Sequence, residues 1–523
     1  MVAKQKILWI DDEIDSFKAQ IIFLQKNNFD VLTATNAHDA LDILKDELVD
    51  LILLDEIMPG LRGLEALMEI KKIRPHIPVV MVTKSEEEDV MNEAIGKNIS
   101  GYLIKPVSNA QLLSTVKQHI QKPKLFEEQT RKSYFESFRE LSQKIDYAND
   151  PEEWIEIYKE ITYWDLQTQS AGSREMDQFI EEQKDNANIA FSNFIEKNYL
   201  DWIENEDSRP LMSQVILKEK LFPYLKDDEP VVLILIDNFR YDHWLTVSSL
   251  VSKYFKIKEQ TLFYSILPTT TQYSRNAIFS GLMPAEIKRL FPDYWFDDEE
   301  DEHKNLFEKE LLEKNLTRHG IKTDFFFRKI FNNSFAEKVN KEINEIKNSK
   351  LSVIIYNFID ILSHKQTSDT TLKELASDEK SYRSITHSWF STSPINTMLQ
   401  QLAENKIKVF ITTDHGSIRI KKPIKVVGYK ETSTNIRYKQ GKALTLENPK
   451  DERNIFLIDK PQKAVLPQPH PSSKYIFAKN DYFFVYPNNY NDYVKKFRNS
   501  FQHGGISMEE MLIPFISLIP KEL

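Results

Sequence analysis

The sequence contains no cysteine among its 523 residues. This absence excludes disulfides, thiol nucleophiles, iron–sulfur clusters and cysteine-type zinc sites. A bound metal ion would therefore have histidine, aspartate, glutamate or hydroxyl ligands.

Long apolar segments are also missing. The run VVLILI (231–236) is far shorter than the ~18 residues that a membrane-spanning helix needs. Acidic residues follow Met1 too early for a secretory signal peptide. We therefore expect a cytoplasmic protein without membrane insertion. At about 100–200 residues per domain, its length predicts roughly three domains.

The first 122 residues alternate short apolar runs with helix-length amphipathic segments. The runs are KILWI (6–10), FDVLTA (29–34), DLILLD (50–55), PVVMVT (78–83) and GYLIK (101–105). This rhythm predicts an α/β domain, a doubly wound sheet of five parallel strands with helices on both faces. Residues 123–205 carry apolar residues at helical spacing and predict a helical connector bundle. Apolar strand-like runs return in 206–523, which predicts a second, larger α/β domain.

Charged and hydroxyl side chains stand at the ends of the predicted strands of the first domain. They are Asp11, Asp12, Asp55, Thr83 and Lys105. Because the carboxyl ends of parallel strands meet at one edge of a sheet, we expect these groups to converge there. Three clustered carboxylates favour a hard divalent cation, most simply Mg²⁺, and the lysine and threonine suit a phosphoryl group on one aspartate.

The segments WIDDE, LLDEIMPG, MVTKS and GYLIKP resemble the receiver domain of bacterial response regulators across residues 1–122. The resemblance implies that Asp55 accepts the phosphoryl group from a sensor histidine kinase and that Asp11 and Asp12 bind Mg²⁺ with it. Thr83 and Lys105 would contact the phosphoryl group, and Tyr102 would be the aromatic switch. Ordering of this region around the added charge predicts a homodimer on phosphorylation.

Acids and imidazoles also follow the strand-like runs of the last domain. Asp237 follows VVLILI, Asp360 and His364 follow LSVIIYNF, and Asp414 and His415 follow KVFITT, while His503 precedes two glycines. Three carboxylates and three imidazoles at one face of a sheet suit Zn²⁺, with Mn²⁺ as the alternative. Two such ions about 3.5–4 Å apart would clamp the oxygens of a phosphoryl displacement, and PTTTQ would supply a nucleophilic hydroxyl.

The motifs DNFRYD (237–242), PTTTQYSRNAIFSG (268–281) and HGGISMEEMLIP (503–514) resemble the PglZ branch of the alkaline phosphatase superfamily over about 206–523. The resemblance implies that Thr271 is the nucleophile. Thr270 and Thr269 are the alternatives, because the alignment with the family motif could shift by one residue. One zinc would have the ligands Asp237, Asp414, His415 and Thr271. The other would have Asp360, His364 and His503.

Arg240, Arg275 and Asn276 are candidate substrate contacts, and each is equally a candidate for a structural salt bridge or cap. Residues 406–500 carry 19 lysines and arginines against 8 acidic residues, a net +11 in a chain of net charge −10. The basic stretch IRIKKPIKVV (418–427) lies here. This charge favours an anionic ligand, with a solvated surface as the alternative.

The sequence therefore predicts a two-component response regulator in three parts, a receiver domain (1–122), a helical connector (123–205) and an effector domain (206–523). Phosphorylation at Asp55 would control a zinc-dependent phosphodiesterase that cleaves nucleotide-type phosphodiesters, cyclic oligonucleotides among them. The combination resembles regulators of type IX secretion. The alternative is a signalling adaptor whose zinc domain docks a transcription factor or a secretion-system protein. The sequence contains no identifiable basic recognition helix, so we expect no DNA-binding domain.

Overall fold

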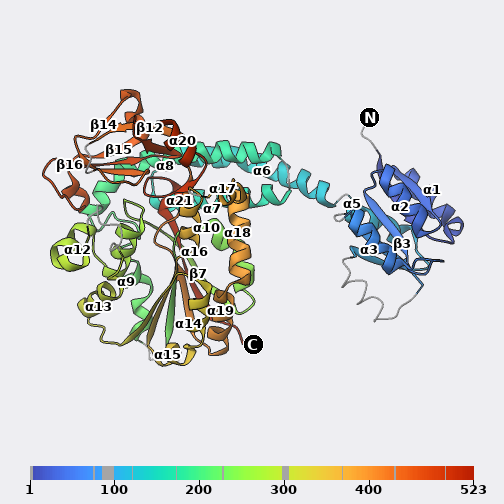
Figure 1. Cartoon of the computed structure of the whole chain (residues 1–523), viewed down its shortest axis with the longest axis horizontal. Helices are drawn as coiled ribbons and strands as arrows, with labels where there is room; N and C mark the ends of the chain where they lie inside the picture. The colour runs from blue at the N-terminus through green and yellow to red at the C-terminus, as the bar shows by residue number, and fades with distance from the viewer. Residues whose placement is uncertain are drawn as a thin grey trace. The chain divides into compact units, whose positions relative to one another are not determined.

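The computed structural model describes residues 4–74, 77–84, 99–120, 122–171, 174–226, 229–296, 305–367, 369–428, 432–488 and 490–522. The chain divides into two compact units (Figure 1). One consists of Met1–Glu136 with Ser170–Ser173, and the other of Ser137–Gln169 with Arg174–Leu523.

The N-terminal unit contains a parallel sheet of five strands in the order β2-β1-β3-β4-β5. The strands are β1 (Gln5–Ile10), β2 (Phe29–Ala34), β3 (Leu51–Asp55), β4 (Val79–Thr83) and β5 (Gly101–Ile104). The helices described between and after them are α1 (Lys18–Lys26), α2 (Ala37–Asp46), α3 (Gly63–Ile73) and α5 (Asn109–Ile120). The predicted doubly wound receiver fold is confirmed.

Both faces of this sheet are buried, as expected for parallel strands covered by helices. Ile7 and Trp9 belong to one apolar cluster and Leu8 and Ile10 to the other, because successive strand residues point to opposite faces. The strands therefore end at a common edge with their polar residues Asp11, Asp55 and Thr83 brought together.

Three long helices follow, as the apolar spacing predicts. They are α6 (Lys122–Tyr147), α7 (Pro151–Ala171) and α8 (Arg174–Glu204). Pro151 occupies the first position of α7, where its missing N–H has no helical partner in any case. Trp154 on α7 packs against Phe191 and Phe194 on α8, with ring centroids 5.4 and 5.8 Å apart.

The large unit is built on a six-stranded sheet in the order β7-β19-β10-β6-β9-β8. Its strands are β6 (Val231–Ile236), β7 (Phe255–Tyr264), β8 (Phe325–Ile330), β9 (Leu351–Tyr356), β10 (Lys408–Thr412) and β19 (Leu512–Pro520). Strands β10, β6, β9 and β8 are parallel, and β19 is antiparallel to both β10 and β7. The predicted second α/β domain is confirmed.

Many helices accompany this sheet in the large unit, and the last but one, α20 (Tyr490–Phe497), packs on the small sheets of residues 418–502 (Figure 1). The helices are α9 (Ile216–Lys220), α10 (Tyr241–Val251), α11 (Asn276–Ser280), α12 (Pro284–Leu290), α13 (Glu308–Arg318), α14 (Asn333–Asn340), α15 (Ile343–Asn348), α16 (Phe358–Lys365), α17 (Thr370–Leu375), α18 (Glu379–Thr392), α19 (Pro394–Glu404), α20 and α21 (Met508–Met511).

Three small sheets come from residues 418–502. The first pairs β11 (Ile418–Arg419) with β18 (Phe501–Gln502). The second has the order β14 (Thr445–Leu446), β12 (Lys422–Val427), β17 (Tyr482–Val485). The third has the order β13 (Tyr438–Lys442), β16 (Ser473–Ala478), β15 (Ile455–Ile458). Among the described residues, no helix combines the length and apolarity needed to span a bilayer.

Candidate metal centres and active site

The first group of acids lies at the carboxyl edge of the receiver sheet. Asp11, Asp12 and Asp55 each offer an oxygen, and these oxygens lie within 4.8 Å of one another. Lys105 Nζ lies 2.7 Å from Asp11 Oδ2 and 3.0 Å from Asp55 Oδ1. Burial raises the pKa of Asp55, although Lys105 opposes the shift. The structure thus brings together the groups that the sequence places at these strand ends.

The remaining receiver residues are close to the same edge. The Thr83 hydroxyl is buried and donates to Glu56 Oε2 at 2.6 Å. Tyr102 is partly buried against the core. Burial raises the pKa of Tyr102, while its hydrogen bond with Thr83 lowers it. Glu56 was not among the predicted site residues, although it follows Asp55 directly and so emerges at the same strand end.

The second group of acids lies at the carboxyl ends of β6 and β10. His415 Nε2 lies 3.6 Å from Asp237 Oδ1 and 3.8 Å from Asp414 Oδ2. Thr271 begins a single π-helical turn, η3 (Thr271–Arg275). Its Oγ1 lies 3.1 Å from His415 Nε2 and 3.5 Å from Asp237 Oδ1. Four side chains from three segments that are distant in the sequence therefore lie close together around His415 Nε2.

The third group adjoins the second. Asp360 stands in the first turn of α16, and its two oxygens lie 3.3 Å from His364 Nε2 and 3.4 Å from His503 Nε2. The His415 and His503 rings stack with centroids 4.1 Å apart. Asp360, His415 and His503 also offer ligand atoms within 4.8 Å of one another. All six acids and imidazoles named by the sequence thus lie in one continuous cluster.

Backbone carbonyls set the orientation of two imidazoles. His415 Nδ1 lies 3.1 Å from Gly416 O, and His503 Nδ1 lies 3.2 Å from Thr269 O. A proton on each Nδ1 satisfies these carbonyls and leaves Nε2 with a lone pair toward the acids. This arrangement is typical of histidines that bind metals.

Burial and neighbouring charges shift the pKa values in opposite directions. Burial raises the pKa of Asp237 well above its ordinary value, although Arg275 opposes the shift. Burial also raises the pKa of Asp360, but His364 and His503 outweigh it and the net pKa lies well below normal. Burial lowers the pKa of His415 to about 4, whereas Asp360 raises that of His364 to about 9. His415 is therefore neutral at pH 7, as a ligand requires.

The neighbouring threonines differ from Thr271. The Thr269 hydroxyl donates to Gly505 O at 2.9 Å and accepts from Gly504 N at 3.0 Å. Thr270 is 7% exposed, and its hydroxyl has no hydrogen-bond partner among the described residues. Of these three threonines, Thr271 is the one whose described hydroxyl contacts reach the acid and imidazole cluster, which favours it as the nucleophile.

Two of the three candidate substrate contacts are engaged in buried ion pairs. Arg275 pairs with Asp237, with Asp414 at 2.9 Å and with Glu308 at 3.4 Å. Arg240 is fully buried between Asp242 and Glu379. Their guanidinium groups hold carboxylates of this chain, so the structure favours the salt-bridge alternative for both.

Asn276 opens α11 and is 2% exposed, so its burial favours a structural role.

The lysines of the basic stretch 418–427 are also engaged in contacts within the chain. Lys421 pairs with Glu181, Lys422 with Asp481 and Lys425 with Glu447, at 2.8 to 3.0 Å. These lysines therefore belong largely to intramolecular ion pairs.

A cavity of about 360 Å³ opens beside the cluster. Its lining includes Thr271, His364 and His503 together with Asn435, Tyr438 and Phe497. The last three come from β13, the segment just before it and α20, and no motif marks them in the sequence.

Three family models match the chain. The response regulator receiver domain matches residues 7–117, the PorX response regulator linker domain matches residues 124–203, and the BREX system PglZ alkaline phosphatase-like domain matches residues 216–518. The predicted combination of receiver, connector and PglZ domain is confirmed.

Solved structures match the receiver part. A CheY-like receiver domain from Methanospirillum hungatei is 25% identical, covers 23% of this chain and 95% of its own, and has a TM-score of 0.22. A receiver domain from Clostridium thermocellum is 33% identical over 23% and 98% of the two chains, with a TM-score of 0.22. That of NtrX from Brucella abortus is 30% identical over 22% and 98%, with a TM-score of 0.21.

The fold and the matches define a two-component response regulator with a hydrolase-like effector. A receiver domain implies a phosphodonor such as a sensor kinase. Both the receiver and the alkaline phosphatase-like domain are of kinds that use divalent metals. With more than half of its length matched, the chain belongs to the PglZ alkaline phosphatase-like family, in the PorX-type architecture.

Proposed function

We propose that this regulator is a zinc-dependent phosphodiesterase for nucleotide-type phosphodiesters, cyclic oligonucleotides among them, and that phosphorylation of Asp55 controls it. The observation that carries the proposal is the single cluster of six acids and imidazoles with the Thr271 hydroxyl beside it, 3.1 Å from His415 Nε2 and 3.5 Å from Asp237 Oδ1. The same proposal assigns Mg²⁺ to the receiver acids Asp11, Asp12 and Asp55.

The donor set suits a pair of zinc ions. Three carboxylates and three imidazoles, without cysteine, match the ligand chemistry of catalytic zinc. Asp237 and Asp414 are buried with Arg275 as their cation, and like charges so placed favour further positive charge. Bound zinc would polarise the phosphoryl oxygen and lower the pKa of the Thr271 hydroxyl.

The residues of the chain then define the reaction. Thr271 Oγ forms a bond to phosphorus and loses its proton to solvent, while the bond from phosphorus to the leaving oxygen breaks and solvent protonates the departing alkoxide to an alcohol. Water cleaves the resulting phosphothreonine diester in a second step and restores Thr271. His415, whose pKa is lowered to about 4, stays neutral throughout and acts as a ligand rather than as an acid.

The substrate class rests on charge and shape. A diester carries a single negative charge at the reacting phosphorus, so the metal pair and Thr271 suffice without a further arginine. Arg240 and Arg275 are held by carboxylates of the chain and are thus absent from the cavity lining as described. Tyr438 and Phe497 belong to that lining, so part of the wall is aromatic, which is compatible with a nucleotide substrate.

Regulation follows from the architecture. Phosphorylation at Asp55 promotes a homodimer, and the regulator serves type IX secretion. The match of residues 124–203 to the PorX response regulator linker domain supports only the PorX-type architecture behind this proposal. Light scattering with and without beryllofluoride tests the dimer, and an unchanged mass at all concentrations argues against it.

The decisive experiment combines metal analysis with diester cleavage for wild type, Asp237→Ala, Thr271→Val and the control Thr317→Val. Thr317 is an exposed helical threonine on α13 whose hydroxyl bonds only Glu313 O in that helix. We expect two zinc ions per wild-type chain, impaired zinc binding in Asp237→Ala, and lost cleavage with retained zinc in Thr271→Val. If signalling in cells survives Thr271→Val, the output is docking of a transcription factor or secretion-system protein, and catalysis is incidental.

A further inference from the structure

The segment that carries His503 also packs on the turn that carries Asp414 and His415. Gly416 N donates to Glu510 O at 3.2 Å. A Cβ at Gly416 would lie 2.0 Å from the carbonyl oxygen of Glu509, closer than real Cβ atoms approach. The backbone of Glu509 and Glu510 therefore fixes the position of the residue that follows His415.

Helix α8 of the connector holds this same backbone. Asn188 Nδ2 donates to Glu509 Oε2 at 3.0 Å, and Asn188 Oδ1 accepts from Met508 N at 2.8 Å. Both Asn188 and Glu509 are 1% exposed. Hydrogen bonds to a buried carboxylate are stronger than those between neutral groups in water, so this pair is a firm attachment.

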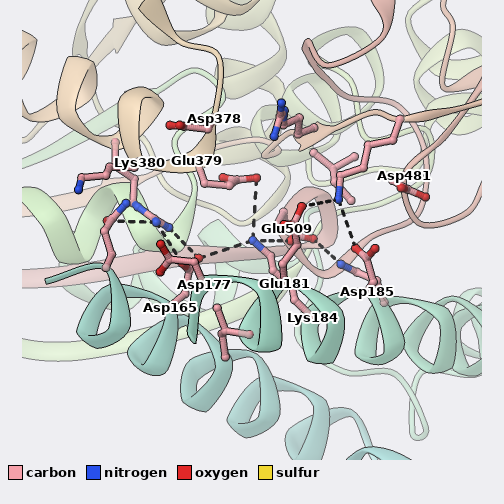
Figure 2. A pocket seen from close by; sticks show the side chains of 17 residues that line it. Asp165, Asp177, Glu181, Lys184, Asp185, Asp378, Glu379, Lys380, Asp481 and Glu509 are labelled. Carbon is pink, nitrogen blue, oxygen red and sulfur yellow. Dashed lines mark hydrogen bonds and ion pairs between the residues drawn. The ribbon is translucent and has the colours of Figure 1, made fainter. Parts of the chain in front are cut away.

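A partly buried ion network reinforces the attachment (Figure 2). Lys184, one helical turn before Asn188 on α8, places Nζ 3.0 Å from Glu509 Oε1 and 4.0 Å from Glu379 Oε1. Glu379 pairs with Arg240, and Arg240 Nη1 donates to Ser417 O at 3.1 Å. A second route thus runs from α8 to the chain just after His415.

We propose that Asn188 and Glu509 are positioning residues through which connector helix α8 sets the geometry of the metal ligands Asp414, His415 and His503. The inference rests on the proposed function, because it concerns the same metal centre. The connector is then a structural part of the active site, so a displacement of α8 would change the positions of the ligand side chains.

The test exchanges the donor and the acceptor of the Asn188–Glu509 hydrogen bond. Asn188→Asp keeps the acceptor for Met508 N but places a carboxylate against Glu509 Oε2. Glu509→Gln in the same chain restores a donor and returns the net charge to that of wild type. Gln183→Glu is the matched control, since Gln183 is a 3% exposed amide on α8 that bonds Phe138 O and Ser142 within the connector.

Zinc affinity by chelator competition, the absorption spectrum of the cobalt-substituted protein, and kcat and KM for diester cleavage are measured for each variant. We expect Asn188→Asp to lose up to about 10-fold in metal affinity, the lower end of the effect of changing a residue that bonds a ligand directly, because Asn188 acts on the ligands through Glu509. Its cobalt spectrum should change and kcat should fall with KM unaltered. The double variant should recover all three, and Gln183→Glu should match wild type.

Wild-type metal affinity and spectrum in Asn188→Asp would overturn the inference, as would equal losses in Gln183→Glu. If Asn188→Asp does not fold, the double variant decides, because only a paired contact is rescued by reversal. A wild-type protein that binds no zinc refutes the proposed function instead.

Discussion

Removal of the Arg275 side chain tests whether it is a structural cation or a substrate contact. Its guanidinium is 1% exposed and pairs with Asp237, Asp414 and Glu308, each also buried. Burial alone would lower the pKa of Arg275, but these carboxylates raise it above its ordinary value. Breaking a buried ion pair by deleting one partner costs about 3–5 kcal/mol, because the other charge remains buried without compensation. We therefore expect Arg275→Met to destabilise the metal-free protein by about this amount.

Chemical denaturation in EDTA and in excess zinc measures the effect. Zinc should recover part of the loss, since it supplies positive charge to the same carboxylates. Arg289→Met, at an exposed arginine on α12, is the control and should change stability by less than about 0.5 kcal/mol. If Arg275→Met resembles this control in EDTA while KM for the diester rises, the structural explanation is wrong and Arg275 contacts substrate.

Three further predictions concern single side chains. Thr270→Val removes a buried hydroxyl without a described partner, so the free energy of unfolding should stay the same or rise by up to about 1 kcal/mol. Loss of cleavage in Thr270→Val but not in Thr271→Val would show that Thr270 is the nucleophile. Because Asp360 raises the pKa of His364 to about 9, this imidazolium stabilises the metal-free protein fully below pH 6.5 and ceases to do so as the pH rises through 9. Zinc binding near pH 7.5 should then release about one proton or more, and calorimetry in two buffers that finds none contradicts this. Lys105→Met should tighten Mg²⁺ binding to the receiver, because Lys105 competes for oxygens of Asp11 and Asp55, and weaker binding by calorimetry would argue otherwise.

Strand ends were the informative part of the sequence. A buried parallel strand has a recognisable apolar run, and topology alone brings the following residues to a common edge. Asp55 after β3 and Asp237 after β6 could therefore be placed before any side-chain position was known. His503 was harder, because the short strand before it, β18, has only two residues and no apolar run.

The partners of buried charges were not predictable in this way. Arg240 and Glu379 are 139 residues apart, and Asn188 and Glu509 are 321 apart. Neither pair belongs to a repeating pattern, since each contact arises from how separate elements pack. An arginine in a motif looks the same in sequence whether it faces substrate or a buried carboxylate, and only the fold distinguishes the two.

The charge balance around the effector site explains how these acids can be buried before a metal arrives. Asp237, Asp414, Asp360 and Glu308 are offset by Arg275, by Lys329 at 2.8 Å from Glu308, and by a protonated His364. The metal-free site therefore holds nearly enough positive charge to fold. Unlike a small zinc-dependent domain, whose folding energy comes from the metal itself, this effector has a large apolar sheet to stabilise it. On the proposed function, zinc would replace the proton of His364 in a fold already formed, so chelation should abolish cleavage while leaving the domain folded.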